Sequence, residues 1–150
     1  FSSATTVLMG GSAGGLTALN TAVRDASLCA GVVVKYPVVD LVAMLQSDDP
    51  FEGHHMPALV GSEDQAAERS PHNNALALRD TPILVFHGDQ DHSVPLVHSE
   101  RLRDAIEAVG GNIQLEVFAG EGHGFRNSVN ITREFTVTEE FLYSLMKNAR

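Results

Sequence analysis

The sequence predicts an α/β domain, in which a mostly parallel sheet is flanked by helices. Short apolar runs alternate along the chain with longer amphipathic stretches, which is the strand–helix order of this fold class. One run, at residues 31–34, reads Gly-Val-Val-Val and suits a strand that is buried on both faces of a parallel sheet. With 150 residues, the chain has the size of one domain that can bury a core.

Four apolar runs are predicted to be strands, and three amphipathic stretches are predicted to be helices. The strands are expected at residues 4–9, 30–36, 82–87 and 113–118, and the last alternates polar and apolar residues, which places it nearer an edge. The helices are expected at residues 16–23, 96–109 and 131–147, with a Gly-Gly pair closing the second. In the last helix, the side chains expected to be buried are those of Phe135, Phe141, Leu142 and Leu145.

The stretch between the second and third strands, residues 38–80, is less regular than the rest. It carries Pro50, Pro57 and Pro71 together with scattered large apolar residues. Because prolines interrupt both helices and strands, no single long element is predicted there. We expect this segment to pack over the sheet, close to the functional site.

Composition and charge exclude several classes of function. The formal net charge of −9 disfavours nucleic acid and anionic membranes as partners. Cys29, the single cysteine, excludes an internal disulfide and has no second cysteine with which to form a metal site. The neighbours His54 and His55 cannot share one helix face, and no nearby Cys or Glu completes a site, so we expect no metal. We expect no cofactor either. No apolar run reaches transmembrane length, and we expect a cytoplasmic protein, although the first residue is Phe1 rather than Met.

The motif most indicative of chemistry is Gly10-Gly11-Ser12-Ala13-Gly14, directly after the first apolar run. It reads G-x-S-x-G, a sharp strand-to-helix turn that leaves the serine hydroxyl exposed at its tip. Glycine is expected at positions 10 and 14 because a Cβ there would collide with the neighbouring strand or helix. The alternative is a glycine-rich turn without chemistry.

A serine nucleophile needs a general base and an acid that orients this base, and two later loops supply candidates. Asp91 follows the third strand and His123 follows the fourth, with Asp89 as an alternative acid. The loops after parallel strands meet at one edge of the sheet, so Ser12, Asp91 and His123 are expected to lie together. Their order along the chain is that of the α/β-hydrolases. Of the other histidines, His92 is the one most expected to influence the site.

Three segments carry a resemblance to a known family, and they are Gly10-Gly11-Ser12-Ala13-Gly14-Gly15, His87-Gly88-x-x-Asp91-x-x-Val94-Pro95 and Gly120-Glu121-Gly122-His123-Gly124-Phe125. These segments resemble the catalytic domain of the prolyl oligopeptidase family, and in it the branch of acylaminoacyl-peptidases and dipeptidyl-aminopeptidases. Four further segments resemble the connecting region of that branch, and they are Tyr36-Pro37-x-x-Asp40-Leu41, Phe51-Glu52, Leu59-Val60-Gly61 and Ser70-Pro71-His72. The resemblance extends over nearly the whole chain.

The resemblance implies an α/β-hydrolase fold and cleavage of peptide or acyl-amide bonds in short peptides, without a metal. It implies that Ser12 is the nucleophile, Asp91 the acid and His123 the base, with the backbone N–H of Ala13 as an oxyanion donor. It also implies that residues 1–150 form the C-terminal part of the hydrolase domain. The earlier strands, a second oxyanion donor and a β-propeller would then be encoded upstream.

Two further expectations concern association and activity. The first strand, with Val7 and Leu8, is expected to leave an open sheet edge through which the chain could self-associate. Since the same triad also serves ester hydrolysis, a carboxylesterase is the alternative to a peptidase. A second alternative is an inactive fragment or a non-catalytic scaffold.

Overall fold

A computed structural model of the chain describes residues 2–46 and 56–148. Its centre is a four-stranded sheet in which every neighbouring pair of strands is parallel, in the order β1-β2-β3-β4. The strands are β1 (Val7–Gly11), β2 (Gly31–Lys35), β3 (Ile83–Gly88) and β4 (Ile113–Phe118). The predicted α/β class with a parallel sheet is therefore confirmed. Within the described residues, the outer edge of β1 pairs with no strand.

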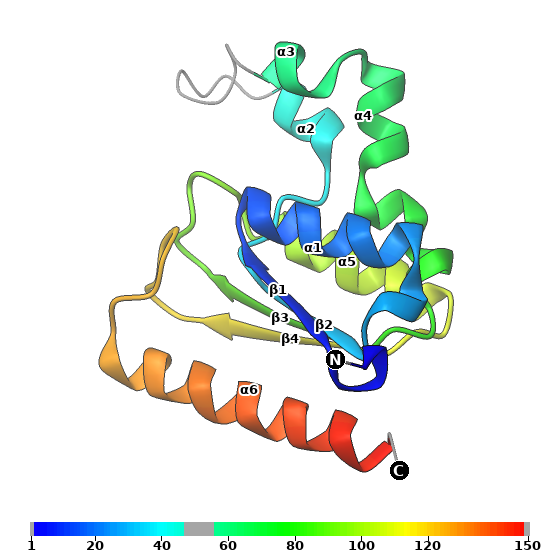
Figure 1. The fold of residues 1–150 in the computed structure, drawn as a ribbon. Coiled ribbons are helices and arrows are strands. Elements are labelled where there is room, and N and C mark those ends of the chain that lie inside the picture. Colours follow the sequence, from blue (N-terminus) through cyan, green and yellow to red (C-terminus); the bar gives the residue numbers. More distant parts are fainter. Residues whose placement is uncertain (1, 47–55, 149–150) are drawn as a thin grey trace.

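Helices cover both faces of this sheet, as Figure 1 shows. The helices α1 (Ala13–Arg24) and α5 (Val97–Ala108) lie on one face, and α6 (Ser128–Asn148) runs along the other. Parallel neighbours need long crossover connections, and α1 lies in the one from β1 to β2 while α5 lies in the one from β3 to β4. The result is a three-layer arrangement in which the loops after the strands gather at one edge of the sheet.

The core lies on both sides of the sheet and explains the valine run of β2. Val32 and Val34 pack with Leu19, Leu102 and other residues of the α1–α5 side. Val33, which points to the opposite face, packs in the cluster that includes Phe118 and Val137 beneath the sheet. Because successive side chains of a strand alternate between faces, a strand buried on both sides must be apolar throughout.

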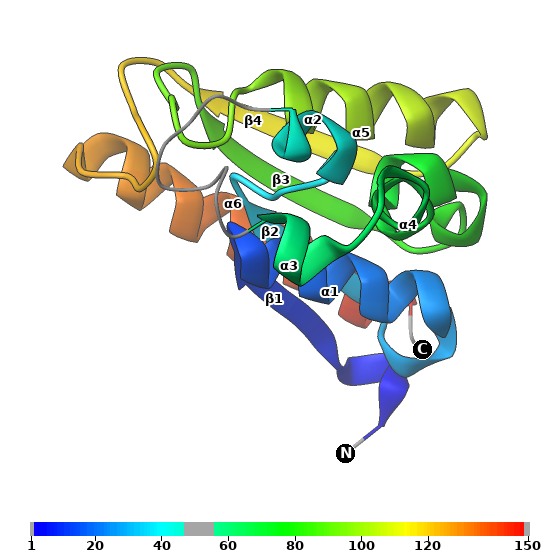
Figure 2. The same cartoon turned by 90° about the horizontal axis from the view of Figure 1, so that it is seen from above.

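Residues 38–80 fold largely into short helices rather than remaining irregular. They include α2 (Leu41–Leu45), α3 (Met56–Val60), α4 (Glu63–Arg69) and a 3-10 segment at Pro71–Leu78 that is kinked at Asn74. Figures 1 and 2 show α2, α3 and α4 above the layer of α1 and α5, on its side away from the sheet. The His54-His55 pair and the Phe51-Glu52 motif lie outside the described residues.

Two differences from the predicted elements have simple physical causes. Residues 3–5 form a 3-10 turn that the Ser2 side chain caps, so β1 starts later than predicted and continues through Gly11, which pairs with Lys35 of β2. In α6, the prediction that Phe135 is buried is wrong, because its side chain is 70% exposed. Val137 and Leu145 define the buried face, and a residue two positions before Val137 points roughly 200° away from it on a helix.

Among the described residues, none of the helices combines the length and the apolar character that a bilayer-spanning segment requires.

Candidate active site

Three loops meet at the edge of the sheet where the strands end. Ser12 follows β1, Asp91 follows β3 and His123 follows β4. Since these strands are parallel, their C-terminal ends lie at the same edge, and residues that are 32 and 111 positions apart come into hydrogen-bond distance. The expected convergence of the three side chains is therefore present in the structure.

The turn between β1 and α1 holds Ser12 in a strained conformation. Its φ angle is 53°, in the left-handed region that residues other than glycine rarely adopt. Its N–H donates to the carbonyl of Lys35 at 3.0 Å, and its own carbonyl accepts from the N–H groups of Gly15 and Leu16 at 3.0 and 3.2 Å. These bonds tie the turn to β2 on one side and to the first turn of α1 on the other.

The glycines around Ser12 differ in whether their surroundings leave space for a Cβ. A Cβ on Gly10 would lie 2.3 Å from the carbonyl oxygen of Gly14, and one on Gly15 would lie 2.9 Å from Cβ of Pro37. A Cβ on Gly14 would meet no atom within 4 Å. The steric prediction is therefore correct for Gly10 and wrong for Gly14, because the space at a Gly14 Cβ is open while the Gly14 carbonyl packs against Gly10.

Ser12, His123 and Asp91 form a continuous hydrogen-bonded chain. Nε2 of His123 lies 3.0 Å from Oγ of Ser12, and Nδ1 of His123 lies 2.7 Å from Oδ2 of Asp91. An ionised carboxylate can only accept, so Nδ1 carries the proton and Nε2 is free to accept from the serine hydroxyl. The arrangement can remove a proton from Ser12 and place the resulting positive charge beside a carboxylate.

The Asp91 carboxylate is held by its own loop as well as by His123. Its side chain is fully buried, and its second oxygen accepts the N–H groups of Ser93 and Val94 at 3.0 and 2.9 Å. Burial raises the pKa of Asp91, but His87, the Val94 N–H and His123 together outweigh burial and leave the pKa below its ordinary value. Asp91 is thus kept as the anion.

His87 supports the loop that carries the Asp91 carboxylate. Its ring is fully buried, with Nδ1 at 2.6 Å from Oγ of Ser99 and Nε2 at 2.8 Å from the carbonyl oxygen of Val94. The carboxylate of Asp91 lies farther away, 3.5 Å from Nε2, so the proton on this nitrogen bonds mainly to the Val94 carbonyl. His87 therefore fixes the loop that carries Asp91 without reaching the serine.

Asp89, the alternative acid, faces a different partner. Its Oδ1 accepts the N–H of Gly120 at 2.7 Å, so it joins the loop after β3 to the loop after β4. The close approach of these loops also depends on Gly88, where a Cβ would lie 2.2 Å from the carbonyl oxygen of Glu121. The structure thus places Asp91 at the histidine and gives Asp89 a bridging role.

Glu121 is a supporting residue that the sequence analysis did not single out. Its buried carboxylate accepts the N–H groups of Arg126 and Asn127 at 2.9 Å and the side-chain amide of Asn130 at 3.0 Å. The bond from Asn130, together with those from the two backbone groups, lowers the pKa of Glu121. It thereby joins the loop of His123 to the start of α6. The signal for this role in the sequence was an acidic residue placed two positions before His123 and shortly before the start of α6.

The chain matches one known protein family along nearly its whole length. The family model described as the prolyl oligopeptidase family matches residues 1–149. The chain belongs to the prolyl oligopeptidase family. The predicted resemblance is therefore confirmed over essentially the full length of the sequence, and the fold is that of the α/β-hydrolase peptidases.

Individual members of this family and one esterase are similar to the chain. Dipeptidyl aminopeptidase BIII of Pseudoxanthomonas mexicana is 30% identical over 146 residues, which are 90% of this chain and 21% of that protein. Isoprenylcysteine alpha-carbonyl methylesterase of Arabidopsis thaliana is 40% identical over 42 residues, 28% of this chain and 10% of that protein. A crystal structure of puromycin hydrolase has a TM-score of 0.89 at 28% identity, covering 97% of this chain and 22% of that one.

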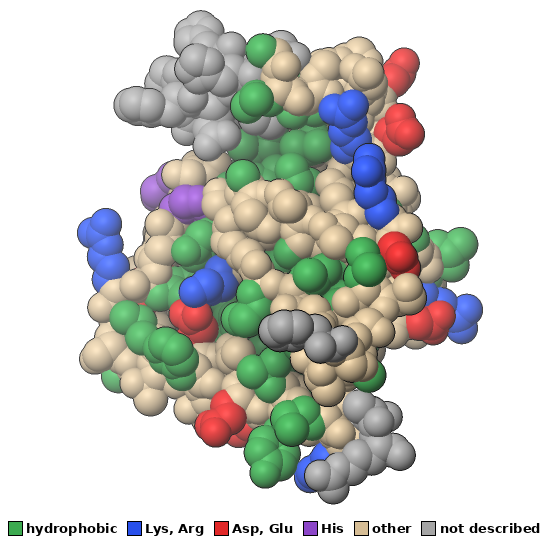
Figure 3. Space-filling view, viewed as in Figure 1, with side chains coloured by type: hydrophobic (Ala, Val, Ile, Leu, Met, Phe, Trp, Pro, Cys, Tyr) green, Lys and Arg blue, Asp and Glu red, His purple; other side chains and the backbone are tan. Residues whose placement is uncertain are grey.

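An apolar cavity of about 300 Å³ opens directly beside Ser12. Ser12 and Ala13 form one wall, and the other walls are mostly aliphatic side chains, namely Leu16, Val38, Leu41, Met44, Leu59 and Val60. The two polar side chains at its margin are engaged, because Asn20 donates to the carbonyl of Arg69 and Arg69 donates to the carbonyl of Val60. Figure 3 shows hydrophobic side chains gathered between α1 and the short helices above it.

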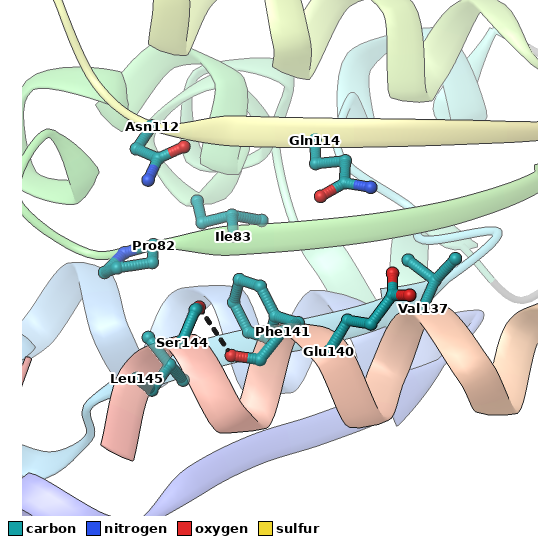
Figure 4. Close-up of a pocket in the computed structure, with 9 residues that line it drawn as sticks. All are labelled: Pro82, Ile83, Asn112, Gln114, Val137, Glu140, Phe141, Ser144 and Leu145. Atoms are coloured by element: carbon teal, nitrogen blue, oxygen red, sulfur yellow. Dashed lines mark hydrogen bonds between the residues drawn. The ribbon is translucent and has the colours of Figure 1, made fainter. Parts of the chain in front are cut away.

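Two other hollows differ from this cavity in chemistry or in position. A polar one lies on the other side of His123 and is lined in part by Gln90, His92 and Arg126. Another, of about 220 Å³, lies between α6 and the first residues of β3 and β4, as Figure 4 shows. This last cavity is at the opposite end of the strands from Ser12 and is lined by no histidine, and the Ser144 hydroxyl beside it donates to the carbonyl of Phe141 at 2.7 Å. Across residues 2–46 and 56–148, no group of three or more potential metal ligands comes together.

Proposed function

We propose that this chain carries the catalytic residues of a serine peptidase that hydrolyses peptide or acyl-amide bonds of short peptides. The observation that carries the proposal is the chain of hydrogen bonds from Ser12 through His123 to Asp91, at 3.0 and 2.7 Å. Membership of the prolyl oligopeptidase family supports the same reaction. The chain spans about a fifth of the length of the peptidases it matches. We therefore propose only the reaction that Ser12, His123 and Asp91 carry out.

In the acylation step, Oγ of Ser12 forms a bond to the carbonyl carbon while Nε2 of His123 takes the hydroxyl proton. The imidazolium that results is stabilised by the Asp91 carboxylate at Nδ1. His123 then gives the proton to the leaving nitrogen, and the bond between carbon and nitrogen breaks. Water, deprotonated by His123 in turn, releases the acid from the acyl-enzyme and restores Ser12.

The negative charge that develops on the carbonyl oxygen requires donors next to Ser12. Ala13 is the first residue of α1, so its N–H has no acceptor within the helix and is available for this oxygen. The positive end of the α1 dipole lies at the same place. Preorganised N–H groups at a developing oxyanion contribute strongly to catalysis, and removing one typically costs roughly a hundredfold to a thousandfold in rate.

The cavities on the two sides of the site indicate how a substrate lies. The acyl part, which becomes bonded to Ser12, is adjacent to the apolar cavity and therefore carries an apolar side chain. The leaving amine receives its proton from His123 and therefore lies toward the polar hollow. Similar proteins named as a dipeptidyl aminopeptidase and a puromycin hydrolase are in keeping with amide substrates of modest size.

The second candidate is an esterase, because ester hydrolysis uses the same residues and is the easier reaction. The identity of 40% with a plant methylesterase over 42 residues favours this alternative. Relative rates distinguish the two functions. A peptidase hydrolyses aminoacyl anilides with an apolar acyl residue, whereas an esterase hydrolyses only the matching nitrophenyl esters.

The experiment that tests the proposal is reaction with a fluorophosphonate, followed by peptide mapping of the labelled residue. We expect one adduct, on Ser12, which Ser12→Ala abolishes and which the matched control Ser27→Ala, at an exposed serine far from the site, retains. Hydrolysis of leucyl and phenylalanyl anilides, with slower turnover of the glycyl anilide, is expected in the same protein. No adduct on Ser12 in folded protein would contradict the proposal, and turnover of esters alone would favour the esterase.

A further inference from the structure

Tyr36 is the second residue of the described chain, besides Ser12, that has a positive φ angle without being glycine. Its φ is 37°, and it stands immediately before Pro37. A residue that precedes proline normally takes an extended conformation, because the proline ring clashes with helical backbone at the position before it. Such strain persists only where the surroundings enforce it, and it is concentrated at functional sites.

The backbone around Tyr36 is bonded to Ser12 on both sides. The N–H of Tyr36 itself donates to the carbonyl of Phe86 at 2.7 Å, which anchors it to β3. The preceding carbonyl, of Lys35, accepts the N–H of Ser12 at 3.0 Å, and the N–H of Val38 donates to the Ser12 carbonyl at 3.4 Å. The strained residue therefore lies in a turn whose backbone is bonded, before and after it, to the backbone of Ser12.

The ring of Tyr36 fills the space between the serine turn and the histidine. Its centroid lies 4.5 Å from that of the His123 imidazole, with the two planes tilted by 52°. Phe125 packs edge-on against the other part of the ring, with centroids 5.5 Å apart. A Cβ on Gly11 would lie 3.2 Å from Cε2 of Tyr36, so the ring also rests against the backbone that leads to Ser12.

We propose that Tyr36 is a positioning residue, whose ring holds the imidazole of His123 in the plane from which Nε2 reaches Ser12. This inference rests on the proposed function and extends it to a residue outside the triad. The bond to Asp91 fixes one atom of the imidazole, about which the ring can still turn, and the His123 side chain is 28% exposed. A flat aromatic surface at 4.5 Å removes that freedom.

The proposal assigns the role to the ring and not to the hydroxyl. Among the hydrogen bonds found in the described residues, none uses the Tyr36 hydroxyl, whereas the ring contacts both His123 and Phe125. Tyr36→Phe is therefore the conservative variant. Tyr36→Asn is the informative one, since Asn tolerates a left-handed backbone but offers no aromatic face.

The test measures the second-order rate of fluorophosphonate labelling at Ser12 in the folded protein, over a range of pH. We expect Tyr36→Phe to react within about twofold of the wild type and Tyr36→Asn to react about 10- to 100-fold more slowly at every pH. The matched control is Phe118→Leu, which removes a ring of the same aromatic cluster, 4.9 Å from Phe125, without contacting His123. It is expected to lower the melting temperature and leave the labelling rate unchanged.

A second measurement does not depend on activity. The NMR signal of the His123 imidazole is expected to shift in Tyr36→Asn, because a neighbouring ring is lost, and to stay in place in Tyr36→Phe. Wild-type protein that is not labelled at Ser12 overturns the proposed function, while labelling of Tyr36→Asn at the wild-type rate overturns only the positioning role. Equal slowing of the Phe and Asn variants also overturns it, since the hydroxyl would then be the active group. Should Tyr36→Asn not fold, Phe125→Leu is expected to slow labelling at least about threefold.

Discussion

The carboxylate of Asp91 lies 2.7 Å from Nδ1 of His123 and is shielded completely from solvent. In that position it selects the imidazole tautomer whose free nitrogen faces Ser12. Replacement by Asn supplies an amide that can donate to Nδ1 and so favours the opposite tautomer. We therefore expect Asp91→Asn to lower kcat by about 10³- to 10⁴-fold with little change in KM.

The control for this variant is Asp89→Asn. The oxygen of Asp89 accepts one N–H, from Gly120, and an Asn side chain can accept the same bond. We expect a kcat within about threefold of the wild type, since the ordinary cost of a perturbed exposed hydrogen bond is small. Steady-state hydrolysis of an aminoacyl anilide measures both variants. Similar losses at positions 89 and 91 would contradict the assignment of Asp91 as the acid.

Glu121→Gln is expected to weaken both stability and activity. The carboxylate accepts three N–H groups, from Arg126, Asn127 and Asn130, whereas Gln offers one acceptor oxygen and turns an amide N–H toward the remaining donors. We expect a lower urea midpoint and slower hydrolysis, because the His123 loop is released from the start of α6. In the control Glu116→Gln, which breaks the partly exposed pair with Arg133, both quantities should remain near those of the wild type.

Gly10→Ala and Gly14→Ala should have opposite effects on the free energy of unfolding. The Cβ added at position 10 would lie 2.3 Å from a backbone oxygen that cannot move aside, so we expect destabilisation of at least roughly 1–3 kcal/mol. At position 14 the Cβ meets open space in the first turn of α1, and the higher helix propensity of Ala is expected to stabilise by up to about 1 kcal/mol. Urea denaturation of the two variants measures the difference, and the reverse order would be inconsistent with the turn described above.

His98 makes the stability of the fold depend on pH. Its ring is buried, with Nδ1 at 3.4 Å from the backbone nitrogens of Val39 and Asp40, and burial lowers its pKa from 6.5 to about 4 despite the nearby Asp40 carboxylate. Since the folded pKa is depressed, the unfolded chain binds the proton first, and stability is lost as the pH falls from about 7 toward 4. We expect the loss to reach about 2 kcal/mol at pH 5.

His98→Asn removes this titration and keeps an acceptor near the position of Nδ1. Between pH 7.5 and pH 5, we expect the free energy of unfolding to fall by about 2 kcal/mol less in the variant than in the wild type. Other titrating groups are present in both proteins, so they cancel in the comparison. Urea denaturation at the two pH values measures the difference, and equal losses in the two proteins would show that His98 is free to ionise in the fold.

Local patterns in the sequence were sufficient for the fold class and the family. The valines of β2 indicate a strand buried on both faces, and the G-x-S-x-G turn behind a strand indicates where a helix starts; both predictions concern residues within one turn or strand. The prediction that Ser12, Asp91 and His123 meet relied on a general property of parallel sheets. The structure brings them together, and their catalytic roles stay predictions until the serine is labelled.

Other features were misjudged because a pattern of residue types does not specify what each side chain meets. Phe135 is apolar and lies near the apolar residues of α6 in sequence, yet the helix turns it to solvent. Gly14 belongs to the motif, but its Cβ position is empty. The segment at 38–80, with its prolines, reads as irregular, although its described parts are largely helical and form one side of the apolar cavity beside Ser12.

By itself, the sequence determined the parallel α/β class, the family and the residues able to carry out acyl transfer, because each of these depends on short segments whose spacing is visible along the chain. Only the tertiary structure decided that Asp91 rather than Asp89 reaches His123, that Glu121 secures the histidine loop, and that the strained Tyr36 places its ring against the imidazole. These are contacts between segments far apart in sequence, and their geometry depends on how the strands, helices and loops pack.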